Sequence, residues 1–377
     1  MKLFCAAVLL CFSVASSCFA LNAYNGYAGY SVGDTRIIGM GGAYLGVSED
    51  INGILYNPAG LVYSQRQFDF KFTCNKIDNF QTDLNDDDKK DGFSLQYWYA
   101  GVVGRIIGPL GNNNIALGMA YAVPYRAAID FDNDVTLSGI PIHVDMNIAL
   151  DVSTYSFPLA VQLWPRFSLG AVLNLYTVEE IFKTEYLNLS YDYSQRVSKT
   201  SVDFGAMYWL TDKLTVGAVF KPAVNFTFDQ TMNYKLASDG SIRWFRNVKL
   251  PERAGLGLSY RVSDNISINA DGNYIGGQKD SELVGSTLTS KFLQYDMKEK
   301  GIIDVHAGGN YTWKINDWLK FDFRGGGYFE PSRVEGVESR LHYTGGIQVY
   351  LWRLYTGLGY DAADDFENFS LIFGYVF

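Results

Sequence analysis

The sequence predicts an all-β fold: a transmembrane antiparallel β-barrel of about fourteen strands with an N-terminal plug inside its lumen. Three patterns in the 377 residues support this prediction. Apolar and polar residues alternate along most of the chain, short and long connections alternate between the predicted strands, and tryptophans gather beside the short connections. A wall whose outer face meets lipid and whose inner face is polar accounts for the first of these patterns.

The chain begins with a segment typical of secretory signal peptides. Lys2 precedes an apolar run over 3–14, small residues follow, and Ala20 is the expected cleavage point, so we expect residues 1–20 to be removed. Cys18 raises the alternative of a lipid anchor, but the residues before it lack the usual leucine. Beyond this segment Cys74 is the one remaining cysteine, and a single cysteine cannot form an internal disulfide.

Period-two alternation defines the predicted strands. Residues 253–262, for example, place alanine, leucine, tyrosine and valine on one face, and glycine, serine and arginine on the other. The predicted strands cover 66–75, 92–107, 114–131, 144–160, 167–183, 199–210, 214–228, 251–262, 266–276, 304–315, 319–329, 340–351, 354–361 and 368–377.

The connections between these strands alternate in length. Tight turns are predicted at 164–166, 211–213, 263–265, 316–318 and 352–353, with a slightly longer one at 108–113. Long polar loops are predicted over 76–91, 132–143, 184–198, 229–250, 277–303, 330–339 and 362–367. Short periplasmic turns and long outer loops are typical of outer-membrane barrels. A soluble β-sandwich also alternates, but its loops would be mixed in length at both ends.

Aromatic residues mark the periplasmic boundary of the predicted barrel and one face of its last strand. Five tryptophans lie beside the tight turns, where an interfacial girdle is expected: Trp164, Trp209, Trp313, Trp318 and Trp352. The last strand places Phe369, Leu371, Phe373, Tyr375 and Phe377 on one face. A terminal aromatic strand that ends in phenylalanine resembles the signal by which the barrel-assembly machinery inserts such proteins into outer-membrane lipid.

Composition and motifs argue against several other functions. A formal net charge of −9 makes nucleic acid an unfavourable partner. Gly39-Met-Gly41 lacks the strand–helix frame of a dinucleotide loop, and 83–91 lacks the glycine and the final glutamate of a calcium loop. The histidines, His143, His306 and His342, lack metal-ligand spacing, and no motif nominates a nucleophile. We therefore expect no enzyme activity, no cofactor and no metal.

Residues 21–61 are the one long segment without strand character ahead of the barrel, which is expected over 62–377. Glycines and alanine over 39–46 permit close packing against an inner wall, and Asp50, Asn52 and Asn57 can bond polar wall groups. A barrel of this size encloses a water-filled lumen unless something occupies it. The segment is therefore predicted to be a plug.

The plug sequence resembles the N-terminal hatch of the FadL family of outer-membrane transporters for long-chain fatty acids and other hydrophobic compounds. The resemblance rests on G-M-G-G-A-Y, S-E-D and N-P-A-G-L, and it extends to 250–260 and 341–377. The matching hatch residues are Gly39, Gly41, Gly42, Ala43, Asp50, Asn57, Pro58, Ala59, Gly60 and Leu61. The resemblance implies a fourteen-stranded barrel, a ligand pocket between hatch and wall, and lateral exit through a break in the third strand.

The predicted third strand contains Gly118 and Pro124, which we assign to this lateral gap. Pro124 has no N–H and cannot donate to a strand ladder. Two interpretations stay open: a local gap in the closed wall, or a proline near the outer rim where pairing has already ended.

Charged residues are expected on the lumen side by alternation: Lys221, Arg261, Asp271, Asp322 and Arg324. Most should pair with one another or with the plug, because buried charges need partners. One arginine, Arg126 or Arg261, could hold a ligand carboxylate through a bidentate contact.

These observations lead to a functional hypothesis: hatch-gated, passive uptake of a hydrophobic, fatty acid-like molecule. The predicted loops over 184–198 and 230–250 carry few apolar residues, which argues against long-chain fatty acid as the specific cargo. Two alternatives are an adaptor in the envelope or in secretion without small-molecule cargo, and a general polar pore.

Overall fold

The computed structural model describes residues 33–64, 68–79, 93–107, 114–137, 140–186, 189–235, 239–286, 291–333, 338–364 and 366–376. The predicted signal peptide, the beginning of the predicted plug, the Asp-rich stretch 83–91 and Phe377 lie outside these residues. Among the described residues, no helix is long and apolar enough to cross a membrane.

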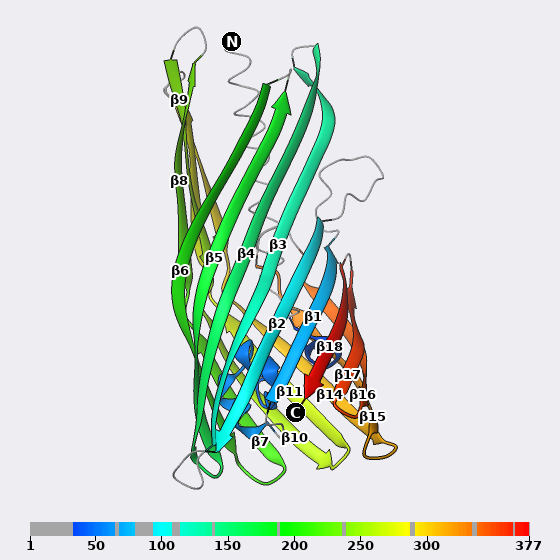
Figure 1. The fold of residues 1–377 in the computed structure, drawn as a ribbon. Coiled ribbons are helices and arrows are strands. Elements are labelled where there is room, and N and C mark those ends of the chain that lie inside the picture. The colour runs from blue at the N-terminus through cyan, green and yellow to red at the C-terminus, as the bar shows by residue number, and fades with distance from the viewer. Residues whose placement is uncertain are drawn as a thin grey trace.

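Fourteen antiparallel strands form a closed barrel, which confirms the predicted fold class (Figure 1). β1 closes the wall by pairing with β18, so that Phe72 lies opposite Phe373. The strands are β1 (Phe68–Asn79), β2 (Phe93–Ile107), β3 (Asn114–Leu137), β4 (Ile140–Trp164), β5 (Phe167–Tyr186), β6 (Leu189–Trp209), β7 (Leu214–Lys221), β10 (Arg253–Ser263), β11 (Ile266–Ile275), β14 (Ile302–Lys314), β15 (Leu319–Glu330), β16 (Arg340–Leu351), β17 (Leu354–Ala363) and β18 (Phe366–Val376).

Four further strands continue the wall above the barrel. β8 (Val224–Lys235), β9 (Asp239–Leu250), β12 (Gln278–Ser286) and β13 (Lys291–Glu299) form their own antiparallel sheet. Together with the long hairpins of β3 to β6, they make one side of the molecule much taller than the side formed by β14 to β18 (Figure 1).

The prediction of long irregular loops over 132–143, 184–198, 229–250 and 277–303 was therefore wrong. These stretches belong almost entirely to strands. Their sequences lack strong apolar alternation because a strand that rises out of the membrane has no lipid to face, yet its backbone still pairs with its neighbours.

Two of the strand breaks between the barrel and the upper sheet fall at prolines, whose backbone nitrogen cannot donate a hydrogen bond. Pro222 separates β7 from β8, and Pro251 separates β9 from β10. The two breaks face each other, since Lys221 pairs with Arg253 below them and Val224 pairs with Leu250 above them. Proline removes a ladder hydrogen bond, so two opposed prolines interrupt both strands at one level.

The outer face of the barrel is apolar and the inner face is polar. Leu117, Leu256 and Leu258 point outward and are 45%, 66% and 49% exposed. Asn269, Asp271 and other polar residues alternate with such positions and are buried inside the barrel. This arrangement, the reverse of a water-soluble protein, is that of a membrane-spanning barrel.

The predicted tryptophan girdle is correct for four of its five members. Trp164, Trp313, Trp318 and Trp352 are all more than half exposed on the outer face. Trp209 instead points inward, because its neighbours Tyr208 and Leu210 occupy the outward positions of this strand end. Its ring lies edge-on to Tyr63, with 5.7 Å between the ring centroids.

Candidate functional site: the inner segment and the wall around it

Residues 33–64, here called the inner segment, lie inside the lower part of the barrel (Figure 1). They form three short helical turns: α2 (Thr35–Gly39), η1 (Ile51–Ile54) and η2 (Pro58–Tyr63). Residues 37–46 are almost all fully buried, although most of them belong to no regular element.

Each helical turn begins at an Asp or Asn that caps it. Asp34 accepts hydrogen bonds from the backbone N–H groups of Arg36 and Ile37. Asp50 accepts from the N–H of Asn52, and Asn57 accepts from the N–H of Ala59. Side-chain caps of this kind satisfy N–H groups that have no partner within a short helix. The polar residues of the hatch-like motif thus fix the path of the inner segment.

The glycines of the motif permit a tight turn close to the wall. Gly41 and Gly42 have φ angles of 62° and 76°, a region that strongly favours glycine. A Cβ atom on Gly41 would also lie 2.6 Å from the backbone nitrogen of Gly327 in β15. A side chain at this position would therefore be strained and would collide with the wall.

The inner wall carries its own glycines opposite the inner segment, a signal that the sequence reasoning missed. A Cβ atom on Gly170 would lie 2.6 Å from the backbone nitrogen of Ala59, and one on Gly326 would lie 2.6 Å from the carbonyl carbon of Met40. Close approaches of this kind recur at Gly205, Gly217, Gly257 and Gly308. Together these glycines leave room for the backbone of the inner segment against strands on several sides of the barrel.

Polar wall residues bind the backbone of the inner segment. The carboxylate of Asp271 accepts hydrogen bonds from the N–H groups of Tyr44 and Leu45 at 2.5 and 2.8 Å. Further donors to inner-segment carbonyl groups come from other strands: Tyr99 to Ile51, Ser168 to Ala59 and Lys221 to Leu55. The Asn57 side chain donates to the carbonyl of Ala206 at 3.0 Å.

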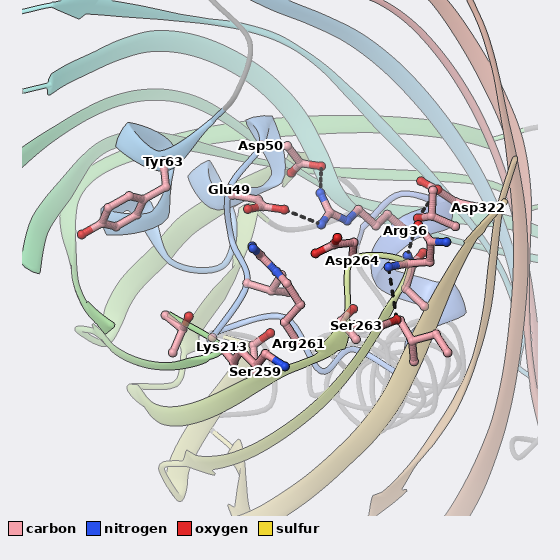
Figure 2. Close-up of a pocket in the computed structure, with 18 of the residues that line it drawn as sticks. Arg36, Glu49, Asp50, Tyr63, Lys213, Ser259, Arg261, Ser263, Asp264 and Asp322 are labelled. Atoms are coloured by element: carbon pink, nitrogen blue, oxygen red, sulfur yellow. Dashed lines mark hydrogen bonds and ion pairs between the residues drawn. The ribbon is translucent and has the colours of Figure 1, made fainter. Parts of the chain in front are cut away.

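A cluster of charges joins the start of the inner segment to β1. Lys71 Nζ lies 2.5 Å from Asp34 Oδ2, and both side chains are almost completely buried. The Arg36 guanidinium contacts Asp50 at 3.0 Å and Glu49 at 3.3 Å, as Figure 2 shows. Burial by itself would raise the pKa of Asp50, but the positive charges of Lys71 and Arg36 hold that pKa well below its usual range.

A polar cavity of about 430 Å³ opens on the tight-turn side of the inner segment (Figure 2). Arg36, Glu49 and Asp50 line it from the inner segment, and Arg261 and Asp264 line it from the β10–β11 hairpin. The cavity carries both charge signs, which makes it suited to water and ions rather than to an apolar molecule.

An apolar cluster lies on another side of the inner segment, against β2 to β5. The inner segment contributes Ile51, Ile54, Leu61 and Val62. The wall contributes Tyr99 and a set of smaller side chains: Val103, Ala116, Ala120, Ala122, Ala160 and Val172. Short alanine side chains follow the inward face of β3 up to Ala122.

A β-bulge in β3 begins immediately above Ala122. Ala122 pairs with Thr154 and Tyr125 pairs with Val152, so Val123 and Pro124 together face the single residue Ser153. Within the described part of the chain, the β2–β3 pairing ends at Val123, whereas β2 continues to pair with β1 as far as Phe93. The apolar cluster thus leads to an irregular region of the wall.

The predicted gap residues flank this region on β3. A Cβ atom on Gly118 would lie 3.2 Å from Cγ of Pro158 in β4, so a glycine faces a proline five residues before the first bulge residue, Val123. Pro124 lies within the bulge itself.

The two arginines predicted as carboxylate ligands lie at opposite ends of the barrel. Arg126 follows the bulge and stands opposite Asp151 in the β3–β4 register. Arg261 lines the polar cavity beside the tight turn. The side chain of Arg126 is outside the described part of the structure. The structure does not bring the two residues together.

Among the other predicted lumen charges, Asp322 and Arg324 pair with each other, whereas Asp271 and Lys221 bind the backbone of the inner segment. Arg324 contacts Asp322 at 2.9 Å and donates to Gln348 at 2.9 Å. His306 and His342, which are isolated in the sequence, are also buried in the lumen beside carboxylates. Neither histidine carries a sequence signal beyond its inward position in the alternation. Among the described residues, no group of three or more potential metal ligands is present.

Comparison with family models and with curated proteins finds no match. Solved structures share the fold over almost their whole length. The Pseudomonas putida toluene transporter TodX has a TM-score of 0.66 at 14% identity, covering 93% of this chain and 99% of that one. A Pseudomonas aeruginosa FadL homologue has a TM-score of 0.64 at 14% identity, covering 91% and 98%. The Ralstonia pickettii toluene transporter TbuX has a TM-score of 0.62 at 14% identity, covering 92% and 98%. The chain therefore has the fold of the FadL-type barrels.

Proposed function

We propose that the protein is a FadL-type channel of the bacterial outer membrane that admits small hydrophobic molecules by passive diffusion. In this proposal the inner segment is the hatch, and the molecule leaves sideways through the irregular region of β3. The solved structures of the same fold include proteins named as toluene transporters and a FadL homologue, which supports this class of cargo.

The observation that carries the proposal is the continuity between the apolar cluster and the bulge. An apolar molecule beside Ile51 and Leu61 would contact the alanines of β3 as far as Ala122, and the bulge that contains Pro124 begins directly after this residue. Transfer of apolar surface out of water, about 0.8 kcal/mol for each buried CH₂ group, would supply the driving force.

The polar cavity supports a lateral rather than an axial exit. Continuing along the barrel axis, a hydrophobic molecule would have to pass Arg36, Glu49 and Asp50. Uncompensated contact with buried charges is unfavourable for an apolar molecule, so the path toward lipid costs less free energy. A carboxylate contact at Arg126, beyond the bulge, remains a prediction for cargo that carries an acid group.

Blocking the apolar path tests the proposal. Ala122→Phe places a large ring on the inward face directly before the bulge, whereas Tyr121→Phe changes the neighbouring outward residue and is the matched control. We expect uptake of labelled toluene by cells producing Ala122→Phe to fall to background, and uptake with Tyr121→Phe to match the wild type. Both variants must show the heat-modifiable gel mobility of a folded barrel. Unchanged uptake with folded Ala122→Phe would contradict the proposed path.

Extraction of the purified barrel separates transport from an adaptor role. A hydrophobic molecule identified by mass spectrometry would support transport. An empty lumen together with a stable complex with other envelope proteins would instead favour the adaptor.

A further inference from the structure

We propose that His306 is held as a doubly protonated imidazolium and, together with Asp271, forms a proton-dependent clamp on residues 41–45 of the inner segment. The charge state of His306 does not depend on the proposed function. Only the consequence of the clamp for gating rests on that function.

The clamp is built from two residues that face each other on adjacent strands. Asp271 in β11 and His306 in β14 are register partners, and both are buried. Asp271 accepts hydrogen bonds from the N–H groups of Tyr44 and Leu45, while His306 Nδ1 lies 2.6 Å from the carbonyl oxygen of Gly41. One wall pair therefore binds both the donors and the acceptor of the same glycine turn.

The surroundings of the His306 ring favour protons on both nitrogens. A carbonyl oxygen cannot donate, so Nδ1 must carry the hydrogen in its contact with Gly41. Nε2 lies 3.1 Å from the carboxylate of Asp304, which in its ionised form is also an acceptor. In a neutral imidazole with its hydrogen on Nδ1, the lone pair of Nε2 would face the Asp304 oxygen at this distance, so the contact favours a second proton on Nε2.

The charges around the ring favour the same state. Asp304 and Asp271 are both buried, and among the described residues neither is paired with a lysine or an arginine. The imidazolium of His306 supplies the positive charge that two buried carboxylates need. On the other side, the ring of Tyr328 stacks on His306 with 4.8 Å between centroids and is followed by His342.

His342 provides an internal comparison. Its Nδ1 lies 2.9 Å from Asp361 and its Nε2 lies 3.2 Å from Glu330, so this histidine also faces acceptors on both sides. All of these partners, and the Tyr328 and Phe366 rings that contact His342, belong to the barrel wall. Deprotonation of His342 would therefore disturb the wall, whereas deprotonation of His306 would release residues 41–45.

The expected direction follows from the proton count. The clamp needs a charged His306 and an ionised Asp271 carboxylate, and it weakens on the alkaline side as rising pH removes one proton from His306. The released proton goes to solvent, and His306 then loses either its bond to Gly41 or its charge contact with Asp304.

Nuclear magnetic resonance of the full-length barrel, labelled with ¹⁵N-histidine, tests the charge state directly. The chain has three histidines, so His306→Gln and His342→Gln assign the signals. We expect both ring nitrogens of His306 to show protonated shifts at pH 7. A signal from an unprotonated His306 nitrogen at that pH would overturn the inference. The same signal is expected if Asp304, and not His306, carries the second proton.

Hydrogen exchange tests the clamp without any cargo. In the wild-type barrel, exchange of the Tyr44 and Leu45 amides, corrected for intrinsic rates, should rise about tenfold or more between acid and alkaline pH. The step should disappear in His306→Gln and persist in His342→Gln. If His306→Gln does not fold, Asp304→Asn should move the step to lower pH. The clamp would be overturned if folded His306→Gln kept the wild-type rise in exchange with pH. It would also be overturned if Asp304→Asn left the pH of that rise unchanged, whatever the uptake assay shows.

Discussion

Lys71 and Asp34 form the most deeply buried ion pair between the inner segment and the barrel wall. Their atoms are 2.5 Å apart, and both side chains are at most 2% exposed. Such a pair specifies where the segment lies, because removal of one partner leaves the other charge buried without adequate compensation.

Asp34→Asn should therefore destabilise the protein although asparagine caps a helix as well as aspartate does. Lys71 would keep only its longer contact with Asp50, 3.9 Å away. We expect the free energy of unfolding to fall by about 3 kcal/mol, measured by urea titration in lipid vesicles. Asp212→Asn is the control, because it breaks an exposed pair with Arg166 and should cost less than about 1 kcal/mol. Equal losses in the two variants would refute the importance of burial.

Asp50 should keep the inner segment in place in mild acid. Its pKa is held well below the usual range, chiefly by Lys71 and Arg36 acting against burial. A lowered pKa contributes stability that is fully present above the unfolded value of about 3.9 and is lost only as pH falls through the folded value. Limited proteolysis should therefore find the segment as protected at pH 4 as at pH 7. Cleavage that starts at pH 4 in a folded barrel would contradict this reading.

Gly170 tests whether the wall glycines seat the inner segment. A Cβ atom there would lie 2.6 Å from the backbone of both Pro58 and Ala59, whereas one at Gly325 would meet nothing within 4 Å. Gly170→Val should displace the segment and destabilise the protein by about 1–3 kcal/mol, while Gly325→Val leaves the segment in place. Protease accessibility of residues 33–64 measures the displacement. Equal accessibility in the two variants would argue against close packing at Gly170.

At the scale of elements, side chains alternate along each barrel strand between the lipid-facing and the lumen-facing side. In β10, Leu256 and Leu258 face outward, while Gly257 faces the inner segment. The same alternation places Trp318 at a tight turn on the outer surface.

Arginine substitutions should therefore have an effect that depends on depth. Leu258→Arg, in the middle of β10, should lower the free energy of unfolding in lipid vesicles by about 2–4 kcal/mol. In Trp318→Arg, at a turn near the membrane interface, the introduced charge should lower the free energy of unfolding by only about 0–1 kcal/mol. Similar losses at both positions would mean that the apolar belt does not follow the predicted membrane axis.

At the scale of the whole molecule, the inner segment and the barrel form one closed structure. The segment contacts strands around the whole barrel, including β1 and β18. Wall side chains hydrogen-bond to its backbone, Lys71 forms an ion pair with it, and wall glycines lie close to it. Loss of these contacts as a set would leave a lumen wide enough for water.

Deletion of residues 33–64 should convert the protein into an open pore. We expect the wild type to conduct little in planar bilayers and the deletion variant to conduct strongly, because its lumen is filled by water. High conductance of the wild type would overturn the assignment of the inner segment as a plug. An equally low conductance of a folded deletion variant would show that another segment closes the lumen.

Local patterns were sufficient to predict the barrel wall. Alternation predicted the outward position of Leu258 and the inward position of Asp271. The short connections predicted tight turns at 263–265 and 352–353, and the structure has turns at 264–265 and 352–353. The upper strands escaped prediction because alternation weakens where both faces of a strand meet water. Trp209 was assigned to the girdle by its place in the sequence, but its position within the strand turned it inward.

The sequence by itself determined the barrel and its inside-out polarity. The caps at Asp34, Asp50 and Asn57 also act over two or three residues, although they were recognised only in the structure. These features depend on residues a few positions apart, so their chemistry is legible along the chain. Only the tertiary structure decided that Asp271 and His306 meet the glycine turn, that Lys71 meets Asp34, and that the β3 bulge borders the apolar cluster. Contacts between residues hundreds of positions apart depend on how the strands close around the inner segment, and no local pattern encodes that closure.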